Sequence, residues 1–289
     1  RCYHSKPLTV LSCTCSFHRG IECQKVSLKG EVVTQSGGSL NVFGAFDYNG
    51  LGWPAATANI RVLGQHPQQF SVNPALMNIG HQPQISFSYQ NPFQSLDLQA
   101  GSLSIKSSIW QRSYIHSLEY FGDEQYSEVK LINGTTWKLE KGFSVGMTLN
   151  YQCLSMSGFN RRQGGSLSLS SYAELSDQIK VGSVVEHVIQ WGQDISLPQN
   201  FQIGGQYEFG PATITVALEK ESALPVETCL GLLISSGSFW QIGVGYRDLS
   251  GMMSAGWRIR TQRIAFHYAC VMHPYLPVSH GFGLELILP

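Results

Sequence analysis

The sequence predicts an all-β protein: a transmembrane antiparallel β-barrel with a short N-terminal plug segment. From residue 84 onward, large apolar residues alternate with small or polar ones, the period-two pattern of strands with one apolar face. Charged residues make up only 13% of the chain, about half the usual share of a globular protein. The last segment, 282–288, keeps this alternation up to Pro289, as the closing strand of a barrel would.

Composition narrows the class of protein further. The formal net charge is zero, which argues against nucleic acid as a partner, because phosphate contacts need a basic excess. The longest apolar runs, such as 229–234, fall far short of the ~18 residues of a membrane-spanning helix. Soluble surfaces normally carry more charge than this chain offers. We therefore expect some of its surface to face something other than water.

The first 34 residues do not share the pattern of the rest of the chain. They contain four of the seven cysteines, but no Cys-x-x-Cys pair that would indicate a zinc site. The chain begins with Arg1 rather than Met, so we expect residues 1–34 to be a leader or an extension. Residues 35–80 are predicted to form a plug or hatch segment, and residues 81–289 the transmembrane barrel.

The predicted strands follow one another from residue 85 to the end of the chain. The first carries Ile85, Phe87 and Tyr89, and a longer one alternates from Phe143 to Cys153. At about 15 residues per strand and turn, residues 80–289 supply about 14 strands, an even number that closes a barrel. Turns are predicted between the strands at Asn133-Gly134, Gly164-Gly165, Phe209-Gly-Pro211, Ser235-Ser-Gly237 and Leu249-Ser-Gly251.

A soluble β-sandwich or barrel is the alternative fold. Such a protein uses shorter strands and places charges on its outer face, whereas the outward faces predicted here carry few charges. Aromatic residues such as Trp191 and Trp240 lie close to the ends of predicted strands, where the interfacial girdles of membrane barrels occur. Both observations favour the membrane barrel.

Residues 40–80 do not alternate and are rich in small residues and proline. Pro74 has a fixed φ and pushes Asn73 toward an extended backbone, and Gly64 can supply a turn with positive φ. We expect this segment to fold as a compact plug inside the lumen. The residues predicted to shape it are Leu51, Pro54, Ala58, Leu63, Gly64, Asn73, Pro74, Ala75 and Leu76.

The order of these motifs resembles the PorV/PorQ family of outer-membrane barrels, which is similar to the FadL long-chain fatty-acid transporters. The segment Tyr120-Phe-Gly122-Asp123-Glu124 looks closer to PorQ than to PorV. The family usually has a second Gly after Leu-Gly and acidic residues before Asn-Pro-Ala, where this chain has Gln65-His-Pro-Gln-Gln69. Over about residues 40–289, the resemblance rests on Leu51-x-x-Pro54-x-x-x-Ala58, Leu63-Gly64, Asn73-Pro74-Ala75-Leu76, Tyr89-Gln-Asn91-Pro92-Phe93, His273-Pro and His280-Gly-Phe282-Gly.

This resemblance implies a non-catalytic barrel of the bacterial outer membrane. Its implied role is that of an accessory or scaffold in type IX protein secretion, or in cell-surface attachment of exported proteins. The implied partners are other outer-membrane or surface secretion and attachment proteins, the lipid bilayer and lipopolysaccharide. The alternative is a FadL-like transporter of a hydrophobic small molecule.

The two functions predict different lumens. A transporter predicts an apolar pocket between the plug and the wall, with a lateral opening where a strand kinks. A scaffold predicts a filled lumen and projecting loops that engage partners.

The sequence contains no pattern typical of an enzyme site. Nucleophile elbows, phosphate loops and paired-histidine helices are absent from it, so no catalytic residue, cofactor or metal is expected. His187, His267, His273 and His280 fall on separate predicted strands and turns, and we expect them to be ordinary residues of those elements.

The last strand is predicted to close the barrel. It would pair with the first strand near 85–89, because these are the two free edges of the sheet. Its lipid-facing residues are expected to be Phe282, Leu284, Leu286 and Leu288.

Overall fold

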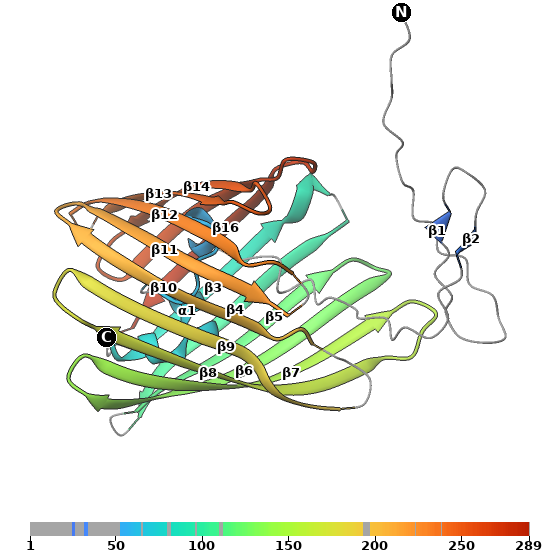
Figure 1. The fold of residues 1–289 in the computed structure, drawn as a ribbon, viewed down its shortest axis with the longest axis horizontal. Coiled ribbons are helices and arrows are strands. Elements are labelled where there is room, and N and C mark those ends of the chain that lie inside the picture. Colours follow the sequence, from blue (N-terminus) through green and yellow to red (C-terminus); the bar gives the residue numbers. More distant parts are fainter. Residues whose placement is uncertain are drawn as a thin grey trace, which may run out of the picture. The chain divides into compact units, whose positions relative to one another are not determined.

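The computed structural model contains a closed antiparallel barrel of fourteen strands among its described residues (Figure 1). Each strand pairs with its neighbours in the sequence, and the last strand pairs with the first. No helix of the described chain is long and apolar enough to cross a membrane. The described residues are 25–26, 32–33, 53–64, 66–79, 82–95, 97–109, 112–192, 197–222, 224–237 and 239–288.

The barrel strands are between eight and fifteen residues long. They are β3 (Gln84–Asn91), β4 (Gln99–Ile109), β5 (Arg112–Gly122), β6 (Tyr126–Glu140), β7 (Phe143–Met156), β8 (Arg162–Glu174), β9 (Ile179–Trp191), β10 (Asn200–Phe209), β11 (Ala212–Glu221), β12 (Glu227–Ser236), β13 (Trp240–Arg247), β14 (Met253–Arg260), β15 (Ile264–Met272) and β16 (Ser279–Ile287).

The barrel closes between β16 and β3, which pair antiparallel. Leu284 lies opposite Phe87, and Leu286 lies opposite Ile85. This pairing leaves the sheet without a free edge, so backbone groups along the wall are hydrogen-bonded between strands. The predicted fold class, an antiparallel barrel of about 14 strands, is therefore confirmed.

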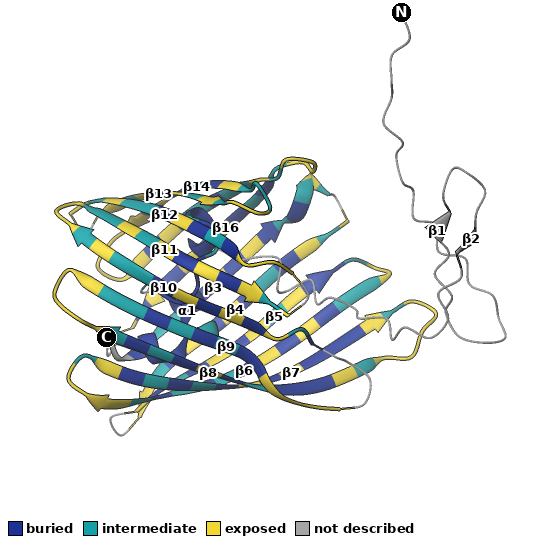
Figure 2. Cartoon of the chain, in the orientation of Figure 1, coloured by how far each residue is buried: buried dark blue, intermediate teal, exposed yellow. Residues whose placement is uncertain are grey.

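Buried and exposed residues alternate along the strands of the wall (Figure 2), so successive side chains lie on opposite faces. On β16, Leu284 is 41% exposed, whereas the next residue, Glu285, is 1% exposed. Phe282, Leu286 and Leu288 are exposed on the same outer face as Leu284. Small polar side chains occupy the inner face of many strands, among them Ser86, Ser88, Ser102, Ser104, Ser117, Ser144, Ser166, Ser168 and Ser170. The wall is thus apolar outside and polar inside, as a membrane barrel requires.

Two of the predicted turns are wrong. Asn133-Gly134 lies within β6, and Gly164-Gly165 lies within β8. Gly134 faces the lumen, where an added Cβ would lie 2.6 Å from the Ile115 side chain. At position 134, glycine is therefore required for close packing inside the barrel rather than for a turn. The predicted turns at Gly210-Pro211, Gly237 and Gly251 do connect strands, and these three glycines have positive φ.

The two ends of the barrel differ in the length of their connections. At the end where β3 begins, connections run from two residues (210–211) to four (175–178). At the other end they run from three residues (123–125) to eight (192–199). Because membrane barrels have short periplasmic turns and longer extracellular loops, we assign the second end to the extracellular side. The extracellular connections are nevertheless short for projecting loops.

The barrel lumen contains three short helical elements from the segment before β3. They are η2 (Trp53–Thr57), α1 (Pro67–Val72) and η3 (Pro74–Ile79). The side chains that define their apolar core are fully buried, including Ile60, Leu76 and Met77. We call residues 53–79 the plug. A further short element, η4 (Pro92–Gln94), follows β3 at the extracellular end.

Residues Arg1–Asn41 form a unit separate from Val42–Pro289. Within it, β1 (Lys25–Val26) and β2 (Val32–Val33) pair antiparallel. Apart from these two strands, the predicted leader or extension, residues 1–34, lies outside the described residues, as do residues 35–52.

We predict that replacing both Leu284 and Leu286 by lysine abolishes assembly of the barrel in membranes. Each lysine on a lipid-facing strand costs about 2–4 kcal/mol near the bilayer midplane. The measurement is heat-modifiable migration of membrane fractions on a gel. The control is a Gln125→Lys, Gln262→Lys double variant, because both residues are exposed in turns. Normal migration of the Leu284, Leu286 variant would contradict the lipid-facing assignment.

Candidate functional site

The plug fits against the wall because several inward-facing wall residues are glycines. A Cβ added at Gly146 would lie 2.5 Å from the backbone nitrogen of Ala75, and one at Gly182 would overlap the carbonyl oxygen of Val62. Glycine allows backbone to approach backbone at these positions. Gly245 likewise meets plug backbone at Ala58, whereas plug side chains pack against Gly204, Gly231, Gly243 and Gly256.

Two side-chain amides organise the plug internally. Asn73 donates from Nδ2 to the carbonyl oxygen of Val62 at 2.7 Å, and its Oδ1 accepts the N–H of Ala75 at 3.1 Å. Gln69 donates from Nε2 to the carbonyl oxygens of Ile60 (3.0 Å) and Leu63 (2.5 Å). These bonds satisfy buried backbone carbonyls that belong to no regular element.

Helix α1 is short and depends on its N-terminal cap. Pro67 occupies the first position, where its missing N–H costs nothing. The ring Nδ1 of His66 accepts the N–H of Gln68, and Oε1 of Gln69 accepts the N–H of His66 at 3.1 Å. This reciprocal arrangement is a capping box. The helix ends before Pro74, which disfavours helical geometry at Asn73.

His66 also attaches the plug to the wall. Its Nε2 lies 2.7 Å from a carboxylate oxygen of Glu285 on β16. The other oxygen of Glu285 pairs with Arg258 on β14 at 2.7 Å, and His267 on β15 lies 3.5 Å from the first. We call these four residues the latch. His66 and Glu285 are both at least 98% buried, so solvent does not screen their contact.

Burial lowers the pKa of His66 from 6.5 to about 4, although the contact with Glu285 opposes this shift. His66 is therefore neutral at neutral pH. Because Nδ1 accepts the N–H of Gln68, the proton of the neutral ring lies on Nε2, the nitrogen that is 2.7 Å from the carboxylate of Glu285.

Two clusters of buried side chains have the composition of a metal site. The first is His66, His267 and Glu285, whose ligand atoms all lie within 4.8 Å of one another. In this cluster the lone pair of neutral His66 accepts the N–H of Gln68, so it is not available to a metal ion. The second cluster is Glu219, Glu227 and Cys229. Its carboxylates both pair with the Arg247 guanidinium, which takes the place a cation would need.

A second buried ionic network surrounds Arg61 of the plug. Its guanidinium donates to Glu186 on β9 at 3.0 Å and lies 3.8 Å from Glu219 on β11. Gln202 on β10 accepts the backbone N–H groups of Arg61 (3.0 Å) and Val62 (3.2 Å). Breaking such a pair leaves an uncompensated buried charge, so these contacts hold the middle of the plug in one position.

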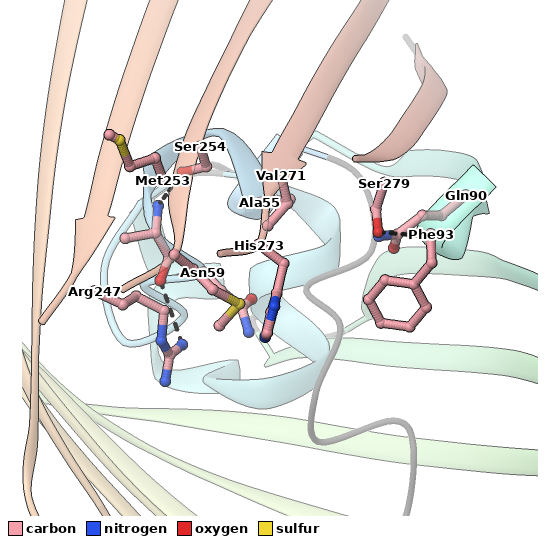
Figure 3. A pocket seen from close by; sticks show the side chains of 12 residues that line it. Ala55, Asn59, Gln90, Phe93, Arg247, Met253, Ser254, Val271, His273 and Ser279 are labelled. Atoms are coloured by element: carbon pink, nitrogen blue, oxygen red, sulfur yellow. Dashed lines mark hydrogen bonds between the residues drawn. The ribbon is translucent and has the colours of Figure 1, made fainter. Parts of the chain in front are cut away.

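A pocket lies between the plug and the wall at the extracellular end (Figure 3). We call it the outer pocket. It has a volume of about 550 Å³, including the part open to solvent, and is bounded by η2, the end of β3 and strands β13 to β16. Its lining residues are Ala55, Ala58, Asn59, Gln90, Phe93, Arg247, Met252, Met253, Ser254, Val271, His273 and Ser279.

A larger cavity lies on the other side of η2, at the periplasmic end. It has a volume of about 1100 Å³, including open solvent space. Trp53, Thr57 and Ile60 of the plug line it, together with polar wall residues such as Gln206 and Gln241. Segment η2 therefore separates the outer pocket from a polar periplasmic vestibule.

The predicted plug residues that the structure describes pack within the lumen, where most of them are structural. Gly64 has a φ of 121°, and a Cβ there would overlap the side chain of Gln69. Pro54, Leu63, Pro74, Ala75 and Leu76 are buried, and Leu51 lies outside the described residues. Of the predicted plug residues, Ala58 alone lines the outer pocket.

Sequence reasoning missed the residues of the latch and of the outer pocket. His66 lies in the stretch where the chain departs from the PorV/PorQ pattern. Its partners Arg258, His267 and Glu285 lie on three different strands. Only the alternation, which places Arg258 and Glu285 on inward faces, hinted that these charges are buried.

No protein-family model matches the chain, and no curated protein matches it in sequence. Solved structures do match in fold. The Ralstonia pickettii toluene transporter TbuX superposes with a TM-score of 0.64 at 10% identity, over 84% of this chain and 100% of that one. The Pseudomonas putida toluene transporter TodX gives 0.61 at 8% identity, over 81% and 97%. A Pseudomonas aeruginosa FadL homologue gives 0.57 at 10%, over 80% and 96%.

The chain thus has the fold of FadL-like outer-membrane barrels. Identities of 8–10% establish the fold alone. A closed barrel of this type, with an apolar outer face, is consistent with the bacterial outer membrane.

We predict that Gly182→Val displaces the plug. A valine side chain would overlap backbone of the plug at Val62, and overpacking of this kind costs about 1–3 kcal/mol. Hydrogen exchange of residues 58–64 should rise by about tenfold. The matched control is Gly205→Val on the neighbouring strand, because a Cβ there meets nothing within 4 Å. Equal exchange in both variants would show that the plug does not depend on this close approach.

We predict that the plug undocks more readily in acid. The pKa of His66 is about 4 in the folded protein and 6.5 when exposed, so docking is fully stable above pH 6.5 and weakens as the pH falls toward 4. Protonated His66 would face Arg258 and His267 as well as the single carboxylate of Glu285. Hydrogen exchange of α1 between pH 7.5 and 5 measures this effect.

The control for the acid effect is His66→Asn, which can still cap α1 but does not titrate. Its exchange should change less with pH than that of the unsubstituted protein. The same pH dependence in both proteins would assign the effect to another group.

Proposed function

We propose that this barrel is a non-catalytic outer-membrane channel that passes a hydrophobic small molecule, which enters at the outer pocket. The observation that carries this proposal is the pocket itself, since a transporter requires an apolar site between plug and wall. Ala55, Phe93, Met252 and Val271 give the outer pocket an apolar surface. A second extracellular cavity is lined by Arg61, Glu119, Lys130 and Glu186, and suits an apolar molecule less well.

The arrangement of cavities along the lumen supports the same proposal. The outer pocket and the periplasmic vestibule lie on opposite sides of η2. Behind η2, the wall residues Gly231, Gly243 and Gly256 offer a surface without side chains. A solute that displaced η2 from this wall would pass from one cavity to the other.

A transporter is also expected to have a strand irregularity, and β9 has one. The ladder between β9 and β10 ends at Glu186, and the pairing of β8 with β9 shifts between Leu167 and Leu169. His187 has a φ of 59° at this point. Beyond it, Gln190 of β9 donates to the carbonyl oxygen of Leu197 at 2.7 Å and accepts the N–H of Leu197 at 3.0 Å, in place of a backbone ladder.

Proteins with the same fold support the transporter. TbuX and TodX are both described as toluene transporters. These neighbours are channels rather than enzymes, which agrees with a non-catalytic role for this chain.

The second candidate is an accessory or scaffold role in type IX secretion or surface attachment. The motif resemblance to PorV/PorQ supports it, as does the dense packing of the plug through Asn73 and Arg61. The short extracellular connections offer little projecting surface for partners. Its partners would be other outer-membrane or surface secretion and attachment proteins, with the bilayer and lipopolysaccharide as lipid contacts. Co-purification of such proteins from detergent-extracted outer membranes, identified by mass spectrometry, would favour this candidate.

We predict that Val271→Phe lowers uptake of an apolar solute several-fold, because the larger ring fills the outer pocket. The measurement is initial uptake of radiolabelled methylcyclohexane by cells that express each variant, relative to cells without the barrel. Val244→Phe is the matched control, since Val244 is 44% exposed on the outer face. Uptake that is equal with and without the barrel would overturn the proposed function.

A further inference from the structure

Two residues that line the outer pocket carry buried polar atoms without a hydrogen-bond partner among the described residues. Oε1 of Gln90 and Oδ1 of Asn59 are both buried and have no hydrogen-bond partner among the described residues. Both residues line this pocket, and Gln90 is 3% exposed (Figure 3). A buried amide without a partner is destabilising. A ligand that supplied the missing partner would remove this penalty.

Backbone strain is concentrated at the same place. Five described non-glycine residues have φ in the left-handed region, and three of them, Ala58, Asn59 and Phe93, line the outer pocket. A fourth, Gln94, follows Phe93 in the chain. Strained residues persist where surrounding contacts hold them, and they are concentrated at binding sites.

Specific hydrogen bonds hold these strained segments in place. The N–H of Ala58 donates to Oγ of Ser254 at 3.0 Å. The N–H of Phe93 donates to Oγ of Ser279 at 2.9 Å. The pocket is therefore a preformed site, with its two amides carried by segments that the barrel wall fixes.

The charge around the pocket disfavours an ionic ligand. Arg247 is the permanently charged residue of the lining, and its guanidinium already pairs with Glu219 and Glu227. A carboxylate would have to compete with these two buried carboxylates for Arg247. A cation would find no acidic residue in the lining and would approach a guanidinium.

We propose that the outer pocket binds an uncharged, mainly apolar small molecule that carries a hydroxyl group, and that Gln90 and Asn59 recognise the hydroxyl. A hydroxyl both donates and accepts, so it can satisfy a side-chain amide in either orientation. Phe93, Met252 and Val271 contact the apolar part. This assignment rests on the proposed function in taking the outer pocket as the entry site, and it names the class of solute.

The test compares cyclohexanol with methylcyclohexane, which differ in a hydroxyl and a methyl group of similar size. Binding to the full chain in lipid nanodiscs is measured by ligand-observed NMR, with empty nanodiscs as the blank. We expect cyclohexanol to bind about tenfold more tightly, the difference that one buried hydrogen bond makes. Gln90→Met, close in shape but without an amide, should abolish this preference and leave methylcyclohexane binding unchanged.

Two further variants keep the test decisive. Gln84→Met is the matched control, because Gln84 lies on the same strand and also has an unpartnered Oε1, but does not line the pocket. It should keep the preference for cyclohexanol. Asn59→Gly removes the second amide at a φ of 55°, a conformation that glycine adopts freely. It should lower the preference even if Gln90→Met fails to fold.

Equal binding of the two probes to the unsubstituted protein would overturn the assignment. So would an equal loss of preference in Gln84→Met and Gln90→Met. Preferential binding of cyclohexanol without any barrel-dependent uptake by cells would instead refute the proposed function and leave the binding site standing. Barrel-dependent uptake without a preference for cyclohexanol would refute the hydroxyl assignment and leave the proposed function standing.

Discussion

Closure of the sheet between β16 and β3 is the constraint on which the rest of this structure depends. In lipid, an unpaired strand edge would leave backbone N–H and C=O groups without water, at a cost of several kcal/mol for each group. The pairing of Leu284 with Phe87 and of Leu286 with Ile85 removes the last such edge. It also sets which residues face lipid, because a shift by one residue would move every side chain of β16 to the opposite face.

Once the wall is closed, the lumen must be filled by protein or by water. In this chain the plug fills most of it. Glycines at positions such as 146 and 182 bring plug backbone against wall backbone. The buried ion pair of Arg61 and the contact of His66 with Glu285 attach the plug to the wall. Buried ion pairs are poor sources of net stability but penalise alternative arrangements strongly. The filled lumen is therefore compatible with a channel, provided that one segment of the plug is held less firmly.

Segment η2 has the properties expected of a plug segment that is held less firmly than the rest. It lies between the outer pocket and the periplasmic vestibule, and small side chains such as Ala55 and Ala56 face the wall there. Helix α1 is held by the latch, and Arg61 is held by Glu186. Among the described residues, the hydrogen bonds between the end of η2 and the wall are those of Ala58 with Ser254 and Arg247. The strained, unpartnered groups of the outer pocket lie at this same end, so binding and plug movement would be coupled through Asn59.

The sequence by itself determined the class of fold and the approximate number of strands. These features follow from local periodicity and length, since alternation reports which face of a strand meets lipid. The tertiary structure alone decided which glycines are turns and which are contact points, as Asn133-Gly134 within β6 shows. The tertiary structure also decided which residues form the candidate site. His66 contacts Glu285, and Asn59 lines the same pocket as Gln90, because the plug packs inside the lumen against strands that are distant from it in sequence. Such contacts follow no sequence periodicity, so no local sequence pattern predicts them.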